Sequence, residues 1–149
     1  MRRPLWELCM SAYDDSNVFA KIIRGELPST KVFEDENVLV IMDVMPQGPG
    51  HTLVIPKAKS RNILDIGADD LTHAILAVQR VARAVKKAFD APGVFVMQFN
   101  EPAAGQTVFH THFHVIPRFE GVALKPHSGG MADAKLLSAH AEKIKAALD

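Results

Sequence analysis

The sequence predicts a single α+β domain, in which an antiparallel sheet of about five strands has one long helix across one side and peripheral helices at both ends. Three observations predict this class. Short runs rich in β-branched residues follow one another between residues 30 and 56 with connections of turn length, a pattern typical of antiparallel strands. One segment, near residues 69–89, has apolar residues at helical spacing. Two more strand-like runs follow it before a final helical segment.

The composition is that of one ordinary globular domain. The chain has 149 residues, of which 48% are hydrophobic and 23% charged, and a chain of this length can bury a core without disulfides or a structural metal. We expect residues 1–16 to form an N-terminal extension, with a docking arm as one interpretation. Residues 17–149 are expected to form the domain, and residues 17–118 carry its informative motifs.

The charge balance argues against polymeric nucleic acid as a partner. Lysine plus arginine and aspartate plus glutamate each number 17, so the chain lacks the positive field that such binding usually requires. No apolar run approaches the ~20 residues of a membrane span, and we recognise no signal peptide. The single cysteine, Cys9, cannot form an intramolecular disulfide. We therefore expect a cytoplasmic protein that binds a small ligand.

The first element expected in the domain is a short helix. Asn17 can cap its N-terminus, and apolar residues at helical spacing follow as far as Arg24. Gly25 favours the end of the helix and Pro28 prevents its continuation.

The next segments predict an antiparallel meander. Residues 32–33 and 38–44 are expected to form a hairpin around the acidic turn at residues 34–37. The segment 46–50, rich in proline and glycine, predicts a loop, and residues 51–55 predict a third strand.

One long helix, two more strands and a final helix are expected to complete the domain. The helix covers about residues 69–89 and has a single apolar face. Strands at residues 94–100 and 108–116 are joined by a loop at residues 101–106, and a final helix is expected at about residues 131–148.

Histidines are concentrated in the last predicted strand. Three of the seven histidines, His110, His112 and His114, alternate along it, so we expect their imidazoles in a row on one face. His51 opens another predicted strand after the glycine-rich turn, from where it can reach the same neighbourhood. Such histidines tend to gather at functional sites. His127, beside a Ser-Gly-Gly sequence, is expected in a loop.

Alternating imidazoles suit two kinds of chemistry. They can ligate a metal ion that keeps an open position for water, but no acid or thiolate lies between Gln106 and Arg118 to assist. Alternatively, one neutral imidazole can attack phosphorus while its neighbours hold the phosphate charge. The preceding Gly105-Gln106-Thr107 offers backbone N–H groups, an amide and a hydroxyl for phosphate oxygens. These residues favour phosphoryl or nucleotidyl transfer over a metal site.

The sequence His-Thr-His-Phe-His-Val-Ile at residues 110–116 resembles the signature of the histidine triad (HIT) family, three alternating histidines followed by two apolar residues. Residues 18–28, 43–57 and 104–108 resemble the same family in the same order, so the resemblance extends over about residues 17–118. The first half is similar to the nucleoside phosphoramidase branch, and the later motifs are also similar to the dinucleoside polyphosphate hydrolase branch.

This resemblance implies a homodimeric hydrolase, without a cofactor, that cleaves at the α-phosphate of purine nucleoside 5′-phosphoramidates through a covalent nucleotidyl-histidine intermediate. Clustered imidazoles disfavour one another's charged forms, which suits an attacking nitrogen that must be unprotonated. Two alternatives stay open: cleavage of dinucleoside polyphosphates by the same nucleophile, and a non-catalytic module that binds nucleotides for regulation.

Matching positions imply a role for each residue of the site. His112 would be the nucleophile, His114 would hydrogen-bond the phosphate, and His110 with His51 would fix the tautomer and proton position beside it. Asp43 would accept the ribose hydroxyls. The apolar slot for the base would consist of Phe19, Ile22, Val44 and Leu53. The groups around the phosphate and leaving group would be Asn100, Gly105, Gln106 and Thr107.

The chain departs from common patterns of the family at two places. Many relatives bind a structural zinc ion through a Cys-x-x-Cys pair and two histidines, whereas the corresponding positions here are Asn17 and Ala20. We therefore expect no bound metal. The third triad position is His114 rather than glutamine, which argues against the uridylyltransferase branch.

Overall fold

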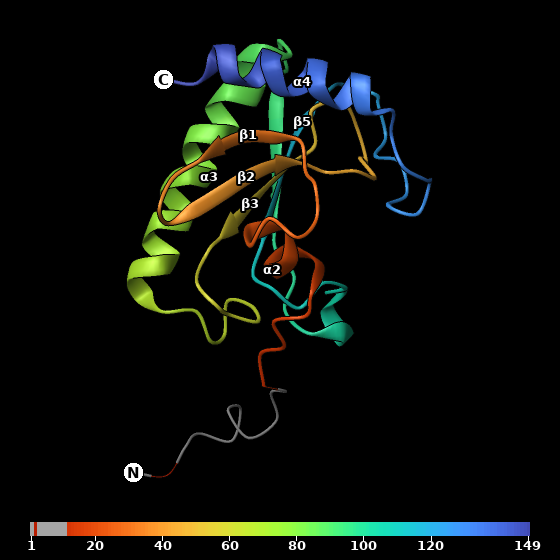
Figure 1. Ribbon diagram of the computed structural model, residues 1–149. Helices are drawn as coiled ribbons and strands as arrows, with labels where there is room; N and C mark the ends of the chain where they lie inside the picture. The colour runs from red at the N-terminus through yellow and green to blue at the C-terminus, as the bar shows by residue number, and fades with distance from the viewer. Residues whose placement is uncertain (1, 3–11) are drawn as a thin grey trace.

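The computed structural model describes residue 2 and residues 12–149 (Figure 1). Most of the extension expected at residues 1–16, and the docking arm proposed for it, therefore lies outside the described residues. The described part, residues 12–16, leads directly into the helix α2 (Val18–Ile23).

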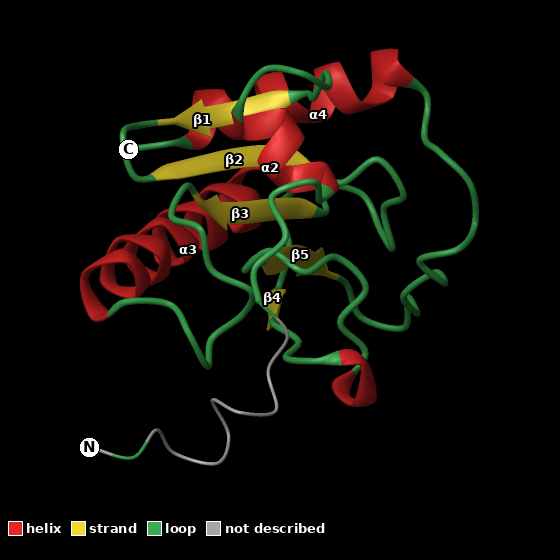
Figure 2. Cartoon of the chain, turned by 60° about the horizontal axis from the view of Figure 1, so that its bottom comes forward, coloured by secondary structure: helices red, strands yellow, loops and turns green. Residues whose placement is uncertain are grey.

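Within the described residues, five strands form one antiparallel sheet in the order β1-β2-β3-β5-β4 (Figure 2). The α+β class with a sheet of about five strands is thus confirmed. The strands are β1 (Lys31–Glu34), β2 (Val38–Met42), β3 (Thr52–Pro56), β4 (Gly93–Met97) and β5 (Phe113–Arg118).

Two of the helices begin at side-chain caps, whereas α3 (Ala68–Ala88) begins after Gly67 without one. The side chain of Asn17 accepts a hydrogen bond from the Ala20 N–H at the start of α2, and Asp133 does the same for Lys135 N–H at the start of the last helix. None of the helices within residues 12–149 has the length and hydropathy needed to cross a membrane. The remaining helices are the 3₁₀ turn η1 (Pro102–Ala104) and α4 (Ala134–Ala147).

One face of the sheet packs against α3 and α4 (Figure 1). Val40, Val54 and Val115 of the central strands share this core with Val81 of α3 and Ile144 of α4. All five side chains are at most 1% exposed, so the C-terminal helix is an integral part of the core.

The opposite face of the sheet carries a smaller core beneath α2. Leu39, Ile41 and Leu53 pack there with Phe19 of α2. Leu53 pairs with Ile41 on one side and with His114 on the other. The same apolar row therefore continues across the sheet into the histidine segment, which places the site on this face.

The last strand is shorter than the sequence suggests. Because β5 begins at Phe113, the predicted strand at residues 108–116 is wrong in its first half. The backbone before it bonds elsewhere: the Thr111 N–H donates to the Ser60 carbonyl oxygen at 3.0 Å, and the two hydroxyls lie 2.7 Å apart. The strand expected at residues 94–100 likewise ends at Met97.

Candidate active site

A cavity of ≈390 Å³ lies between α2 and the sheet. Ile41, Leu53 and His114 contribute to it from three adjacent strands, and its volume is in the range of ~300–1,000 Å³ typical of small-molecule sites. The predicted site residues that line it are Phe19, Ile22, Asp43, Val44, Leu53, Gly105, Gln106, Thr107, His112 and His114. Three predicted residues, His51, His110 and Asn100, lie outside the lining.

His112 has a defined tautomer. Its Nδ1 lies 2.6 Å from the carbonyl oxygen of His110, and because a carbonyl oxygen only accepts, Nδ1 carries the proton. Nε2 of the neutral ring then has a free lone pair and no hydrogen-bond partner. Every fully buried side-chain nitrogen and oxygen of the described residues has a partner, so Nε2 is not fully buried and is open to the cavity. Burial lowers the pKa of His112, which favours this neutral form.

His110 lies behind the cavity rather than in it. His110 is 1% exposed, and its ring is bonded at both nitrogens: Nε2–H donates to the Pro56 carbonyl oxygen at 2.7 Å, and Nδ1 accepts from the Tyr13 hydroxyl at 2.6 Å. The expected row of three imidazoles is therefore wrong for His110, whose ring is bonded to Pro56 and Tyr13 and does not line the cavity beside His112 and His114. The tautomer of His112 is set by the backbone carbonyl of His110, not by a neighbouring imidazole.

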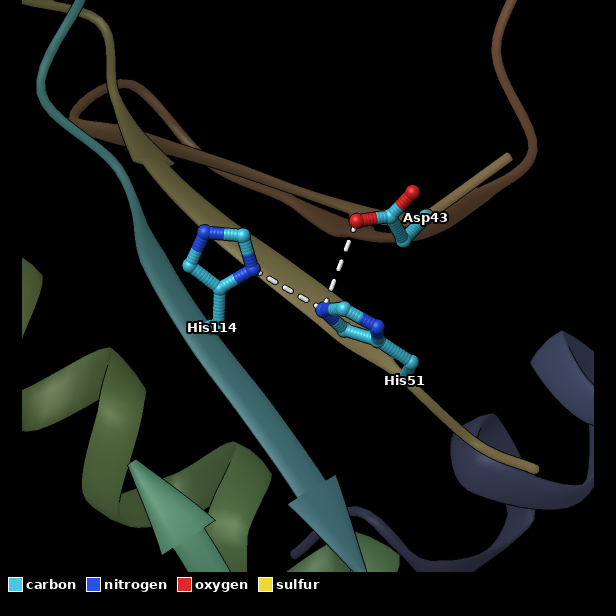
Figure 3. Close-up of side chains that lie close together, drawn as sticks. All are labelled: Asp43, His51 and His114. Carbon is cyan, nitrogen blue, oxygen red and sulfur yellow. Dashed lines mark hydrogen bonds and ion pairs between the residues drawn. The ribbon is translucent and has the colours of Figure 1, made fainter. Parts of the chain in front are cut away.

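His51 fixes the tautomer of His114 instead (Figure 3). The Gln47 N–H donates to Nδ1 of His51 at 3.0 Å, so the proton of the neutral His51 ring is on Nε2 and points to Nδ1 of His114 at 2.9 Å. Burial is the main cause that lowers the pKa of His51 to about 4 and that of His114 to about 3. His114 consequently carries its proton on Nε2. A donor of His114 and an acceptor of His112 thus stand side by side, with ring centroids 5.1 Å apart.

Asp43 is the one carboxylate among the described residues that line the cavity. Oδ1 accepts from the Met45 N–H at 2.8 Å, whereas Oδ2 lies 3.3 Å from Nε2 of His51 and 2.8 Å from Nε2 of His127. Burial alone would raise the pKa of Asp43, but His51, His127 and the Met45 N–H outweigh it and lower the pKa. Asp43 is therefore ionised in the site.

His127 belongs to the cavity, although the sequence indicated only a loop residue. It comes from the connection between β5 and α4, which is bonded to the loop before β3: the Lys125 N–H donates to the Gln47 carbonyl oxygen and the Ala132 N–H to that of Val44, both at 2.8 Å. These backbone bonds join segments far apart in the sequence. No local spacing could have predicted them.

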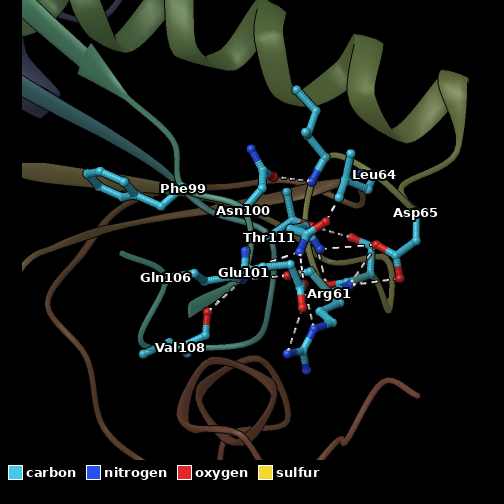
Figure 4. A network of polar contacts seen from close by, with 12 residues as sticks. Arg61, Leu64, Asp65, Phe99, Asn100, Glu101, Gln106, Val108 and Thr111 are labelled. Carbon is cyan, nitrogen blue, oxygen red and sulfur yellow. Dashed lines mark hydrogen bonds and ion pairs between the residues drawn. The ribbon is translucent and has the colours of Figure 1, made fainter. Parts of the chain in front are cut away.

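Gln106 supports the wall of the cavity from within the protein (Figure 4). Its Nε2 donates to the carbonyl oxygens of Arg61 and Val108 at 2.7 and 3.0 Å. Its Oε1 accepts from Nδ2 of Asn62 at 3.1 Å and from the Glu101 N–H at 2.8 Å. The amide is fully engaged, so the expected contact of this side chain with phosphate or leaving group is not what the structure presents.

Asn100 also belongs to this network and not to the cavity. Its Oδ1 accepts from the Ile63 N–H at 2.9 Å, and its Nδ2 donates to Oε1 of Gln98 at 2.8 Å. The network is closed by Arg61, whose Nε contacts Oε2 of Glu101 at 2.7 Å. Asn100 is therefore bonded outside the cavity lining, and its contact with phosphate stays a prediction.

Within the described residues, neither the surroundings of His110 nor the group of Asp43, His51 and His114 suits a metal ion. Beside Asn17 and Ala20, His110 meets a phenol and an amide instead of the thiolates, imidazoles or carboxylates that zinc prefers, and both its nitrogens are engaged. Ligand atoms of Asp43, His51 and His114 lie within 4.8 Å of one another. However, the Gln47 N–H requires Nδ1 of His51 as acceptor, so its Nε2 carries a proton and cannot ligate.

Comparison with known proteins gives a consistent result. The family model of the HIT domain matches residues 24–121. The crystal structure of a HIT-like protein involved in cell-cycle regulation, from Bartonella henselae, superposes with a TM-score of 0.87 at 55% identity and covers 92% of this chain and 100% of that one. A zinc-bound histidine triad family protein from Mycobacterium smegmatis has a TM-score of 0.78 at 35% identity, with 89% and 92% covered. Adenylylsulfatase HINT3 of Arabidopsis thaliana is 37% identical over 110 residues, which are 74% of this chain and 56% of the plant protein.

An antiparallel α+β domain with alternating histidines beside a cavity defines a protein of the histidine triad class. The chain belongs to the HIT family. This family comprises nucleotide-binding proteins and hydrolases.

Proposed function

We propose that the protein is a nucleotide hydrolase that cleaves purine nucleoside 5′-phosphoramidates at the α-phosphate, with Nε2 of His112 as the nucleophile. One observation carries the proposal. The hydrogen bond from Nδ1 of His112 to a backbone carbonyl leaves an unprotonated Nε2 at the cavity, as nucleophilic attack requires.

The reaction has two displacements at phosphorus. Nε2 of His112 forms a bond to the α-phosphorus as the P–N bond to the leaving amine breaks, and the amine takes a proton from solvent. Water then attacks the same phosphorus and loses a proton to solvent, the P–Nε2 bond breaks, and a nucleoside monophosphate is released with the neutral His112 ring. The positive charge that develops on His112 in the first step is stabilised by its Nδ1–H bond to the His110 carbonyl. Nε2–H of His114 donates to a non-bridging phosphate oxygen.

The remaining lining residues divide into an apolar and a polar group. Phe19, Ile22, Val44 and Leu53 provide apolar surface for the base, and the ionised Asp43 accepts the ribose hydroxyls in competition with His127. Backbone groups of Gly105 and the hydroxyl of Thr107 face the phosphate and the leaving group.

A substrate panel tests the proposal. Turnover of adenosine 5′-phosphoramidate, diadenosine polyphosphates and adenylylsulfate is measured for the wild-type chain and for His112→Ala; the last substrate is included because of the plant relative's name. We expect phosphoramidate cleavage that is lost in the variant by a factor of at least ~10³, with AMP binding retained by calorimetry. If the protein cleaves only one of the other two substrates, that compound would replace the phosphoramidate as the proposed substrate. AMP binding without turnover would favour the non-catalytic alternative.

The proposed enzyme is a homodimer. Strand β4 is an edge of the sheet, and its Phe95 and Val96 are 44% and 46% exposed. An apolar edge strand pairs readily with another chain unless it is covered. Strand β1, at the other edge, is short, interrupted by an irregularity and flanked by the ion pair of Lys31 and Glu34, and it contacts α4. These features favour β4 as the edge that joins two copies.

A further inference from the structure

The segment before α2 reaches the histidine cluster through one side chain. Tyr13, in the extension, donates its hydroxyl hydrogen to Nδ1 of His110 at 2.6 Å, across 97 residues of sequence. The two rings are packed edge to face with centroids 5.6 Å apart. The reaction described above makes no use of Tyr13.

The direction of this hydrogen bond is set by its neighbours. Oδ1 of Asn17 accepts from the Ala20 N–H at 2.9 Å, so the amide nitrogen of Asn17 faces the Tyr13 oxygen and donates to it at 3.1 Å. The Tyr13 hydrogen is then directed to Nδ1 of His110, and the proton on Nε2 of His110 is directed to the Pro56 carbonyl oxygen at 2.7 Å. His110 is thereby held at both nitrogens in one tautomer.

The backbone at His110 needs such an anchor. It precedes the first residue of β5, Phe113, so its carbonyl lies outside the strand ladder, yet this carbonyl accepts from Nδ1 of His112 at 2.6 Å. The other anchor nearby is the hydrogen bond from the Thr111 N–H to the Ser60 carbonyl oxygen. The Thr111 N–H belongs to the same planar peptide group as the His110 carbonyl, so two anchors orient this carbonyl: the backbone bond to Ser60 and the held His110 ring.

We propose that Tyr13 is a positioning residue for the nucleophile: it holds the His110 ring and so fixes the carbonyl that keeps His112 in the Nδ1–H tautomer. Asn17 assists by fixing the direction of the Tyr13 hydroxyl. The inference rests on the proposed function, because it assigns Tyr13 to the nucleophile of that reaction. Burial lowers the pKa of His110, in agreement with a neutral ring that accepts from Tyr13.

The test compares Tyr13→Phe, which keeps the ring and removes the hydroxyl, with the wild type. Nitrogen-15 NMR of the imidazoles measures the His112 tautomer in the free protein, and steady-state kinetics with adenosine 5′-phosphoramidate measure kcat and KM. We expect a smaller population of the Nδ1–H form of His112, and a kcat lowered about tenfold with KM within about twofold. Asn17→Ser keeps a helix cap but does not reach Tyr13, so it should change both quantities in the same direction by less.

A matched control removes another side-chain contact of the same segment. Lys59→Ala removes the exposed ion pair of Lys59 with Asp15, 3.5 Å long, and should leave the His112 tautomer and kcat at wild-type values. The proposal is overturned if Tyr13→Phe lowers only the melting temperature, or lowers kcat without changing the His112 nitrogens. The NMR measurement needs no substrate, so it decides the role of Tyr13 even if the wild-type chain fails to cleave the phosphoramidate.

Discussion

Four buried histidines give the site its chemistry at the scale of single residues. His51, His110, His112 and His114 all have a pKa below the ordinary value, with burial as the largest cause. Each ring also makes a hydrogen bond that fixes its tautomer, and three of these bonds involve backbone groups. The cluster is therefore neutral near pH 7, which preserves both the acceptor on His112 and the donor on His114.

This neutrality predicts that acid destabilises the fold. In the unfolded chain these histidines bind protons near pH ~6.5, whereas in the folded protein His51 and His114 do so only near their pKa values of about 4 and about 3. The unfolded state binds more protons in that interval, so the free energy of unfolding decreases as the pH falls from ~6.5 toward ~4. The loss should be on the order of a few kcal/mol in urea denaturation, and His51→Gln should reduce its pH slope. A free energy of unfolding that stays constant between pH ~6.5 and ~4.5 would contradict this account.

At the scale of elements, the loop between β4 and β5 depends on the amide of Gln106. Gln106→Leu would leave buried groups of Arg61, Asn62, Glu101 and Val108 without their partner. We expect the free energy of unfolding in urea to decrease by about 2–4 kcal/mol. Ala104→Ser, at an exposed position of the same loop, should be close to neutral. If Gln106→Leu instead left the stability unchanged and altered the leaving-group preference, the contact of Gln106 with phosphate or leaving group that the sequence predicts would be supported.

The sequence predicted the elements that depend on local patterns. The Asn17 cap of α2, the meander of β1 to β3 and the apolar face of α3 all have short-range signals, and the structure contains each of them. The prediction of where β5 starts was wrong because the apolar and polar alternation extends to residues that bond to Ser60 rather than to a strand. The predicted strand put His110 and His112 in one row, whereas of these two only His112 lines the cavity.

The other omissions concern long-range contacts of single side chains. His127 meets Asp43 across 84 residues and Tyr13 meets His110 across 97, and neither residue belongs to a periodic pattern or a motif. Gln106 and Asn100 have suitable chemistry for a phosphate, but buried partners engage their amides. The residue types predicted the kind of site, and tertiary contacts decided which of them reach the ligand.

At the scale of the whole molecule, the exposed edge of the sheet predicts the state of assembly. Val96→Glu places a charge on the β4 edge strand, and burying it between two copies is costly. We expect sedimentation equilibrium to show a dimer for the wild type and an increase of about 100-fold or more in its dissociation constant for the variant. Leu136→Glu, at a 49% exposed position of α4, is the control and should remain dimeric. A monomeric wild type, or a dimer insensitive to Val96→Glu, would exclude this interface.

The central claim is that Nε2 of His112 forms a bond to phosphorus, and the most direct test is to trap that bond. Wild-type protein is mixed with adenosine 5′-phosphoramidate, quenched in alkali within one turnover, and analysed by intact mass and peptide mapping. The account predicts one adenylyl group per chain, located on residue 112 and absent from His112→Ala. An adduct on another residue, or rapid cleavage by His112→Ala, would contradict it.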